Sequence, residues 1–350
     1  MSSGTLNEAY ERFHNTGPEW GESQLTNHGP MAVEVLVRRG RTDVVGRWAD
    51  RYIRRLDALP SATEAITDAR WAEALGDGRR IGDWTVYFTR LLAEEPWPQV
   101  LAVWWPRLLP GIVAGTTHGV IRVGHVVRAL LAGSENRSTL DELAHALAFW
   151  AARAQAIPAS AVPAGRLGPL AALDALPRVP DQRGTVADRL GQLPRMPGWS
   201  ASASSLRPAA APGDVRARLT DLVTAATLRF LTHGHGHPVL LVHTATAPNA
   251  VLHTLPALPP ELWEPSLTAV WTATAAIFSA YAPAYGPAPT PPAPPTGPDA
   301  VAEVLDRAVA HADEHVIKFT DTAAEVYTRT GHPDALAAAV HVGTLIPPST

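Results

Sequence analysis

Apolar residues recur along most of the chain at the three- and four-residue spacing of amphipathic helices. Alternating apolar and polar runs, which would indicate strands, are scarce. The pattern therefore predicts an all-α fold, a compact multi-helix array with Pro-rich connecting loops. Helices are expected at 31–39, 42–59, 63–75, 84–94, 111–131, 140–155, 215–232, 238–253, 260–282, 299–329 and 334–342.

One segment, 284–298, is dense in proline and is expected to be a surface loop or polyproline-type connector. We expect a single helical domain over residues 1–350. The sequence alone leaves open whether the loop separates two domains or projects from one.

Composition narrows the classes of function. The 350 residues are 46% hydrophobic and 18% charged, which is typical of a globular protein. A net charge of −4 without a Lys/Arg block argues against nucleic acid or an anionic membrane surface as the main partner. No run of about 18 apolar residues predicts a spanning helix. The N-terminus lacks the order of a signal peptide, so a cytoplasmic location is expected. The oligomeric state stays open.

The chain has no cysteine, which excludes disulfides, thiolate metal sites and cysteine nucleophiles. A metal would have to be bound by imidazole and oxygen ligands. Arginine greatly outnumbers lysine, and Lys318 is the only lysine in the chain.

Most of the fourteen histidines need no special role. We expect surface or helix-cap positions for His14, His145, His253, His332 and His341. The tract from His233 to His237, with glycines between its histidines, is expected to be an exposed, flexible loop.

His118 and His125 are the most suggestive pair. Seven residues are close to two helical turns, so both side chains share one helix face, about 10.5 Å apart along the axis, with Arg122 between them. Gly119 and Gly124 would allow close approach of a facing helix or ligand. The spacing fits two metal ligands and fits two hydrogen-bonded core histidines equally well.

His28 and His243 are weaker candidates on sequence alone. His28 precedes Gly29-Pro30, a pair that suits a helix start, with Asn27 as a candidate cap. His243 follows an apolar run that would bring its imidazole into the interior. Either residue is also consistent with a purely structural role.

His311, His315 and Lys318 are expected on one face of a single helix, whereas Asp313 and Glu314 are expected to face water. Apolar neighbours would draw Lys318 into the interior, where burial lowers the pKa of an amine. A neutral amine can react with carbon dioxide to give a metal-binding carbamate. A solvated helix face with an ordinary lysine is the alternative.

Four blocks together resemble the questin oxidase-like family, in the same order and over nearly the whole chain: Asn27-His28-Gly29-Pro30-Met31, Pro110 to Arg128, His243-Thr244-Ala245-Thr246 and His315 to Thr320. The resemblance implies oxygen-dependent C–C cleavage or Baeyer–Villiger-type opening of a polycyclic aromatic polyketide ring, such as an anthraquinone. It implies a reduced nicotinamide cofactor, NADPH, as electron donor.

The resemblance also implies an Fe(II) ion in a buried site whose ligands are His28, His118, His125, His243 and a carboxylated Lys318. Five such ligands leave one octahedral position for O2. Arg122 and Arg128 are candidates for stabilising a substrate phenolate or for helix-packing ion pairs. The alternatives are a zinc-dependent hydrolase using the same histidines and a non-catalytic helical binding protein. The exact substrate and the number of oxygen atoms incorporated stay open.

Overall fold

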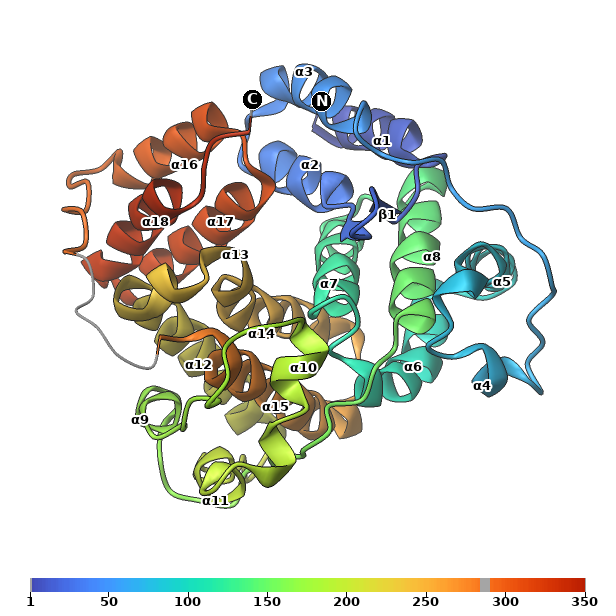
Figure 1. Cartoon of the computed structure of the whole chain (residues 1–350). Coiled ribbons are helices and arrows are strands. Elements are labelled where there is room, and N and C mark those ends of the chain that lie inside the picture. The colour runs from blue at the N-terminus through green and yellow to red at the C-terminus, as the bar shows by residue number, and fades with distance from the viewer. Residues whose placement is uncertain (1, 284–289, 350) are drawn as a thin grey trace. The chain divides into compact units, whose positions relative to one another are not determined.

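A computed structural model describes residues 2–283 and 290–349 and confirms the all-α prediction (Figure 1). Over these ranges, the one sheet is an antiparallel pair of two-residue strands, β1 (Glu19–Trp20) and β2 (Leu25–Thr26). The helices belong to two compact units. Unit 1 comprises Met1–Ala156 and His253–Leu262, and unit 2 comprises Ile157–Leu252 and Trp263–Thr350.

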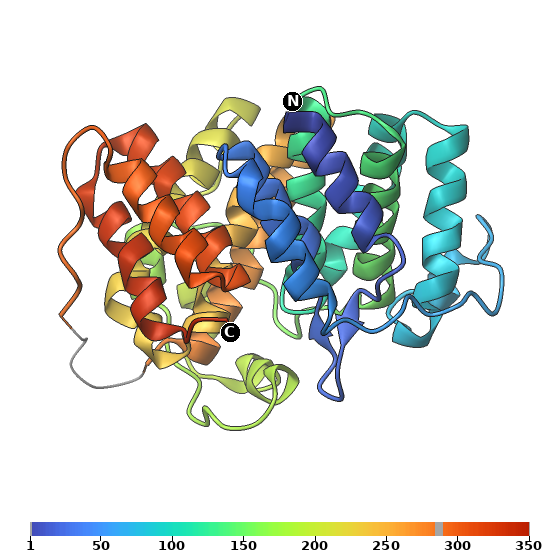
Figure 2. The ribbon, with the colours of Figure 1, turned by 90° about the horizontal axis from the view of Figure 1, so that it is seen from above.

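Unit 1 is built around two neighbouring helices, α7 (His118–Leu131) and α8 (Arg137–Ala152). Helix α2 (Gly29–Arg38) packs against α7, and α5 (Ile81–Glu94) packs against α8. Figure 2 shows α1 (Ser2–Phe13) beside α2 and α3 (Thr42–Ile53). The remaining helices of this unit are α4 (Trp71–Ala74), α6 (Trp97–Leu108), and the short 3-10 helices η1 (Gly78–Arg80), η2 (Leu109–Gly111), η5 (Leu255–Ala257) and η6 (Pro260–Leu262).

Unit 2 has a group of long helices, in which α17 (Glu314–Thr330) packs against α18 (Pro333–Leu345), α16 (Ala300–His311) and α12 (Pro212–His233). Helix α15 (Trp263–Tyr281) packs against α12 and α13 (Pro238–Leu241), which is followed by α14 (His243–Thr254). Shorter elements complete this unit: α9 (Pro169–Asp174), α10 (Val186–Leu190), α11 (Trp199–Ala203), η3 (Leu193–Arg195) and η4 (Gly234–Gly236).

The expected helix at 299–329 is two helices, because Ala312 adopts a left-handed conformation with φ 67° and ends α16. Asp313 then caps α17 by accepting hydrogen bonds from the backbone N–H groups of His315 and Val316. The prediction that His311 shares a helix with His315 and Lys318 is therefore wrong. The imidazole of His311 instead hydrogen-bonds the carbonyl of Ile346 at 2.9 Å.

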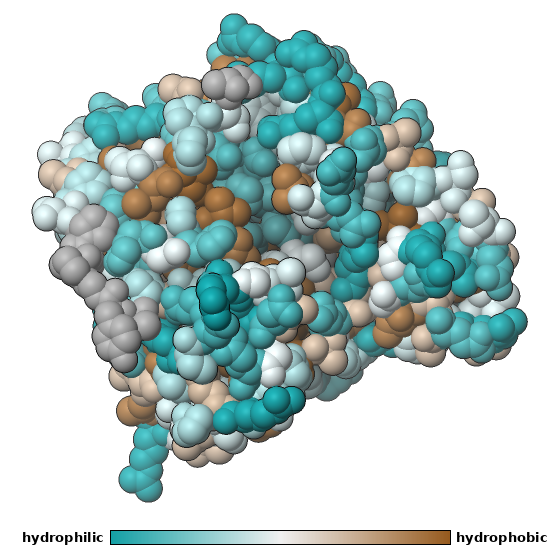
Figure 3. Space-filling model, in the orientation of Figure 1, coloured by the Kyte–Doolittle hydropathy of each residue, from teal (hydrophilic) through white to brown (hydrophobic). Residues whose placement is uncertain are grey.

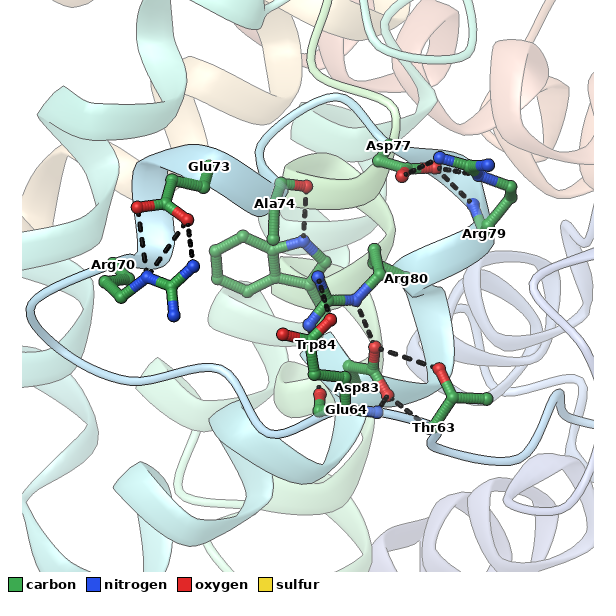
Figure 4. A network of polar contacts seen from close by, with 10 residues as sticks. All are labelled: Thr63, Glu64, Arg70, Glu73, Ala74, Asp77, Arg79, Arg80, Asp83 and Trp84. Atoms are coloured by element: carbon green, nitrogen blue, oxygen red, sulfur yellow. Dashed lines mark hydrogen bonds and ion pairs between the residues drawn. The ribbon is translucent and has the colours of Figure 1, made fainter.

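The segment expected as a helix at 63–75 is helical only in α4, because polar contacts with α5 satisfy its backbone (Figure 4). The Asp83 carboxylate accepts hydrogen bonds from the backbone N–H groups of Thr63 and Glu64, and it pairs with Arg80. The indole of Trp84 donates to the carbonyl of Ala74 at 3.1 Å.

Helices α7 and α6 also differ from expectation. Helix α7 begins at His118 rather than near 111, since Gly115, Thr116 and Thr117 all have positive φ. Helix α6 was not predicted. Pro98 lies in its first turn, where the missing N–H costs nothing.

The Pro-rich segment 284–298 connects α15 to α16, both in unit 2, so it does not separate the two units. Residues 284–289 lie outside the described residues. The part from 290 to 298 is non-helical and largely exposed, as expected of a surface loop.

Hydrophilic side chains dominate the face drawn in Figure 3, with apolar ones interspersed. Among the described residues, every helix is too short or too polar to cross a lipid bilayer.

The α7–α8 packing yields a stability prediction. A Cβ added at Gly119 would lie 2.8 Å from the Cβ and Cγ atoms of Trp150, a buried residue of α8. Gly119→Ala should therefore lower the free energy of unfolding by about 1–3 kcal/mol through overpacking.

Gly46→Ala, in the middle of α3, is the control. Its new methyl group meets nothing closer than Arg12 Nη1 at 3.8 Å, so it should gain up to about 1 kcal/mol. Urea denaturation of both variants measures the difference. Equal stability of Gly119→Ala and wild type would contradict this account of the packing.

Candidate metal centre

His118 is the first residue of α7 and follows the turn of positive-φ residues. Its Nδ1 atom lies at hydrogen-bonding distance from the carbonyl oxygen of Gly115 and 3.4 Å from Thr26 Oγ1. A carbonyl oxygen only accepts, so Nδ1 carries the proton and Nε2 carries the lone pair. This is the tautomer of a histidine that binds a metal through Nε2.

His28 lies at the start of α2, also in unit 1, and its ring is stacked on that of His118. The ring centroids are 4.4 Å apart with 22° between the planes. Each ring has a nitrogen within 4.8 Å of the other. The His28 backbone N–H donates to the Tyr52 hydroxyl at 2.8 Å. His28 itself is the N-cap of α2, so the expectation that Asn27 caps this helix is wrong; the Asn27 side chain instead accepts from the Gly29 N–H, one residue before the usual cap position. Two of the predicted ligands thus lie together.

His125, on the same helix, has different partners. Its Nδ1 atom lies 2.8 Å from Oε2 of Glu34, a buried residue of α2. Burial raises the pKa of Glu34, but Arg128 and His125 outweigh it and bring the pKa down to about 2. The carboxylate is thus ionised at neutral pH and only accepts, which places a proton on His125 Nδ1; Arg128 Nη2 also lies 3.2 Å from this atom. In the neutral imidazole the lone pair is then on Nε2. Among the described residues, His125 does not join the close pair of His28 and His118.

Arg122 and Arg128, the two candidates for stabilising a substrate phenolate, each donate hydrogen bonds to a buried glutamate. Arg128 donates to Glu34 from Nε at 2.9 Å and from Nη2, so it holds the carboxylate that orients His125. Arg122 donates from Nε and Nη2 to the Glu142 carboxylate, at 2.6 and 2.8 Å. Its Nη1 atom is buried and finds no hydrogen-bond partner within the described part of the chain. Burial raises the pKa of Glu142, although Arg122 opposes that shift.

In unit 2, His243 is buried at the break between α13 and α14. Its Nδ1–H donates to the carbonyl of Leu240 at 3.2 Å, so here too Nε2 carries the lone pair. Burial lowers the pKa of His243 well below its ordinary value, and the nearby Lys318 and His315 lower it further. The imidazole is therefore neutral, as a metal ligand must be.

Lys318 is 3% exposed, on a helix whose first half is buried. Burial lowers the pKa of its amine to about 8, although Glu314 and Asp313 oppose the shift. Lys318 is therefore buried, as expected, but its surroundings are not purely apolar, because Glu314, Asp313 and His243 interact with it electrostatically. The expectation that Asp313 and Glu314 face water is wrong: Asp313 is half-buried as the α17 cap, and Glu314 is buried.

His315 was not among the predicted ligands, but it belongs to this cluster. Its ring lies edge-on to that of His243, with centroids 6.0 Å apart, and ligand atoms of Asp313, Glu314 and His315 all lie within 4.8 Å of one another. Its spacing of three residues from Lys318, about one helical turn, is the sequence signal that marks it.

Of the histidines outside the candidate site, some lie where the sequence predicted and others do not. His332 caps α18 by accepting from the Asp334 N–H, which confirms a cap role. His145 and His341 are buried, so a surface position is wrong for both. The His233–His237 tract is a half-buried 3-10 turn rather than an exposed loop, because it packs against α12 and α18.

These residues fit a first-row metal ion with nitrogen and oxygen ligands. A metal-binding histidine commonly donates its second ring N–H to a carbonyl or carboxylate oxygen, and His118, His125 and His243 all do so. Of the five predicted ligands, His28, His118 and His125 belong to unit 1, and His243 and Lys318 to unit 2.

No protein-family model matches the chain, and the search of curated proteins returned no match either. The resemblance to the questin oxidase-like family therefore rests on the four sequence blocks and stays a prediction.

The Arg122–Glu142 pair yields a second stability prediction. Both side chains are buried, so Glu142→Gln leaves a guanidinium in the interior without its counter-charge. The free energy of unfolding should fall by about 3–5 kcal/mol. Asp141→Asn, which breaks a pair with the exposed Arg137 on the same helix, should cost no more than about 1 kcal/mol. Chemical denaturation compares the two. A Glu142→Gln protein as stable as Asp141→Asn would refute the importance of the buried pair.

Proposed function

We propose that the chain is a non-haem Fe(II)-dependent oxygenase that opens a ring of a polycyclic aromatic polyketide, such as an anthraquinone, with O2. The proposed ligands are those predicted from the sequence: His28, His118, His125, His243 and Lys318. One observation carries the proposal. Three of the four histidines have Nδ1 committed to an oxygen acceptor, which leaves Nε2 as the ligating atom.

The donor set favours iron over a closed zinc site. Four imidazoles and one oxygen anion form a five-ligand set, whereas structural zinc sites are tetrahedral and closed. Imidazole with oxygen ligands and an open position is characteristic of non-haem Fe(II) oxygenases. When bound, such an ion supplies the activation of O2 that ring opening requires.

Lys318 supplies the oxygen ligand in this proposal. A pKa of about 8 leaves a usable fraction of neutral amine at physiological pH. The neutral nitrogen adds to the carbon of CO2 and loses one proton, which gives a carbamate anion. Burial protects that anion from bulk water, and the metal ion compensates its charge.

The surrounding residues hold the ligands in place. Glu34 fixes the ring of His125, and Arg128 fixes Glu34, so Arg128 is a positioning residue. Arg122 holds Glu142 in the same unit and retains the two N–H groups of Nη1 for a substrate oxygen. NADPH as electron donor and a cytoplasmic location belong to the same proposal.

Lys318→Arg tests the proposal. Arginine keeps the positive charge but forms no carbamate, so bound iron and oxygen consumption should be lost together. Untagged full-length protein would be loaded anaerobically with Fe(II) in bicarbonate buffer, and iron measured by plasma emission. Oxygen uptake would then be followed with a chemically reduced hydroxyanthraquinone as probe. Loading of the wild type should improve from pH 6.5 to 8, as the amine loses its proton.

Two variants serve as controls. Lys318→Glu supplies a carboxylate directly and should retain part of the iron without bicarbonate, whereas Arg329→Lys, on the same helix, should behave as wild type. Full iron and full uptake in Lys318→Arg would overturn the carbamate ligand. Turnover of an ester or amide without oxygen would favour the zinc hydrolase, and absence of bound metal in the wild type would favour the binding protein.

A further inference from the structure

A second group of metal-binding side chains lies in unit 1, outside the predicted ligand set. It surrounds a pocket of about 190 Å³ where α1 packs against α8. The lining residues are Tyr10, Glu11, His14, Arg137, Ser138, Asp141, Glu142 and His145.

Two Glu-x-x-His motifs contribute side chains to this pocket. Glu11 and His14 form one Glu-x-x-His sequence at the end of α1, and Glu142 and His145 form another within α8. A spacing of three residues brings both side chains of each motif to one side of the chain. Helical carboxylate metal proteins use this motif on facing helices to bind metal ions.

The ring nitrogens of His14 and His145 are as far apart as two nitrogens bound to the same metal ion. Nδ1 of His14 and Nε2 of His145 are 3.4 Å apart, and the rings are edge-on at 82°. Two nitrogens bound tetrahedrally at about 2.0–2.1 Å lie about 3.4 Å from each other. The same distance is long for a direct hydrogen bond, for which about 2.9–3.0 Å is usual.

The charge of the pocket lining favours a cation. Of the three carboxylates in the pocket lining, Glu142 pairs with Arg122 and Asp141 pairs with Arg137. The charge of Glu11 is therefore in excess of these two guanidiniums.

One carboxylate is placed to complete the site. Glu142 is held at both oxygens by Arg122, whereas Glu11 is exposed and accepts one hydrogen bond from Ser138 Oγ at 2.9 Å. Among the described residues, no carboxylate oxygen lies within 4.8 Å of both histidine nitrogens, so the proposed site requires the exposed Glu11 side chain to rotate toward His14.

We infer that this pocket binds a divalent first-row transition metal ion, with Zn²⁺ as its simplest occupant, through His14 Nδ1, His145 Nε2 and the Glu11 carboxylate. Water completes a tetrahedral shell. The ion would link the N-terminal helix α1 to α8. This site requires neither iron nor Lys318, so it is independent of the oxygenase proposal.

Zinc titration of the untagged full-length protein tests the inference. Isothermal calorimetry should show a Zn²⁺ site that His14→Gln removes and that His118→Ala leaves intact, separate from any zinc bound by the proposed iron ligands. Glu11→Gln should weaken this site by at least about tenfold. Ser138→Ala should tighten it, because Glu11 no longer has a competing donor. His332→Gln, at an exposed cap on α18, is the matched control and should bind zinc as the wild type does.

Zinc binding by His14→Gln and Glu11→Gln with the stoichiometry and affinity of wild type would overturn the inference. A wild-type crystal soaked in Zn²⁺ provides a readout that needs no variant. An anomalous peak between the two ring nitrogens, about 2.0–2.1 Å from each, is expected. Its absence at saturating zinc would also refute the site, whether or not the iron site is confirmed.

Discussion

Three imidazoles of this protein each donate their Nδ1–H to an oxygen, and the account of the candidate metal centre depends on those hydrogen bonds. The acceptors are the carbonyls of Gly115 and Leu240 and the Glu34 carboxylate. Each bond selects one tautomer and sets the direction of the Nε2 lone pair.

The acceptors are themselves fixed by the fold. Gly115 belongs to the positive-φ turn that starts α7, and Leu240 lies in the last turn before the break ahead of α14. Glu34 is held by Arg128, which is one turn beyond His125 on α7. The orientation of the three imidazoles therefore depends on carbonyl groups next to helix termini and on the buried ion pair between Glu34 and Arg128. Truncating that pair would leave an unpaired charge in the interior.

Much of the fold could be predicted, because amphipathic helices have a strong periodic signal. The break at Ala312 could not, since an alanine with positive φ has no mark in the sequence. His145 was misplaced for a different reason. Helix α8 is covered by α5 and α7, and α1 packs against the side that carries His145, so a polar residue that a surface helix would expose is buried.

For the candidate site, the sequence named candidate histidine ligands but not how their rings are held. Glu34 is 91 residues from His125, and only the tertiary fold brings them together. A hint was present, since Glu34 interrupts an otherwise apolar stretch of α2 and a buried carboxylate needs a partner. The spacing of the two Glu-x-x-His motifs is equally visible in the sequence, whereas the proximity of their histidines is not.

The central claim is that Nε2 of these histidines binds iron. Anomalous scattering at the iron absorption edge, from crystals loaded anaerobically with Fe(II), tests it most directly. The account predicts an iron peak about 2.0–2.2 Å from Nε2 of His118, of His125 and of His243, with Nδ1 of each still bonded to its oxygen. Iron bound through Nδ1, or an ion that none of the three residues contacts, would contradict it.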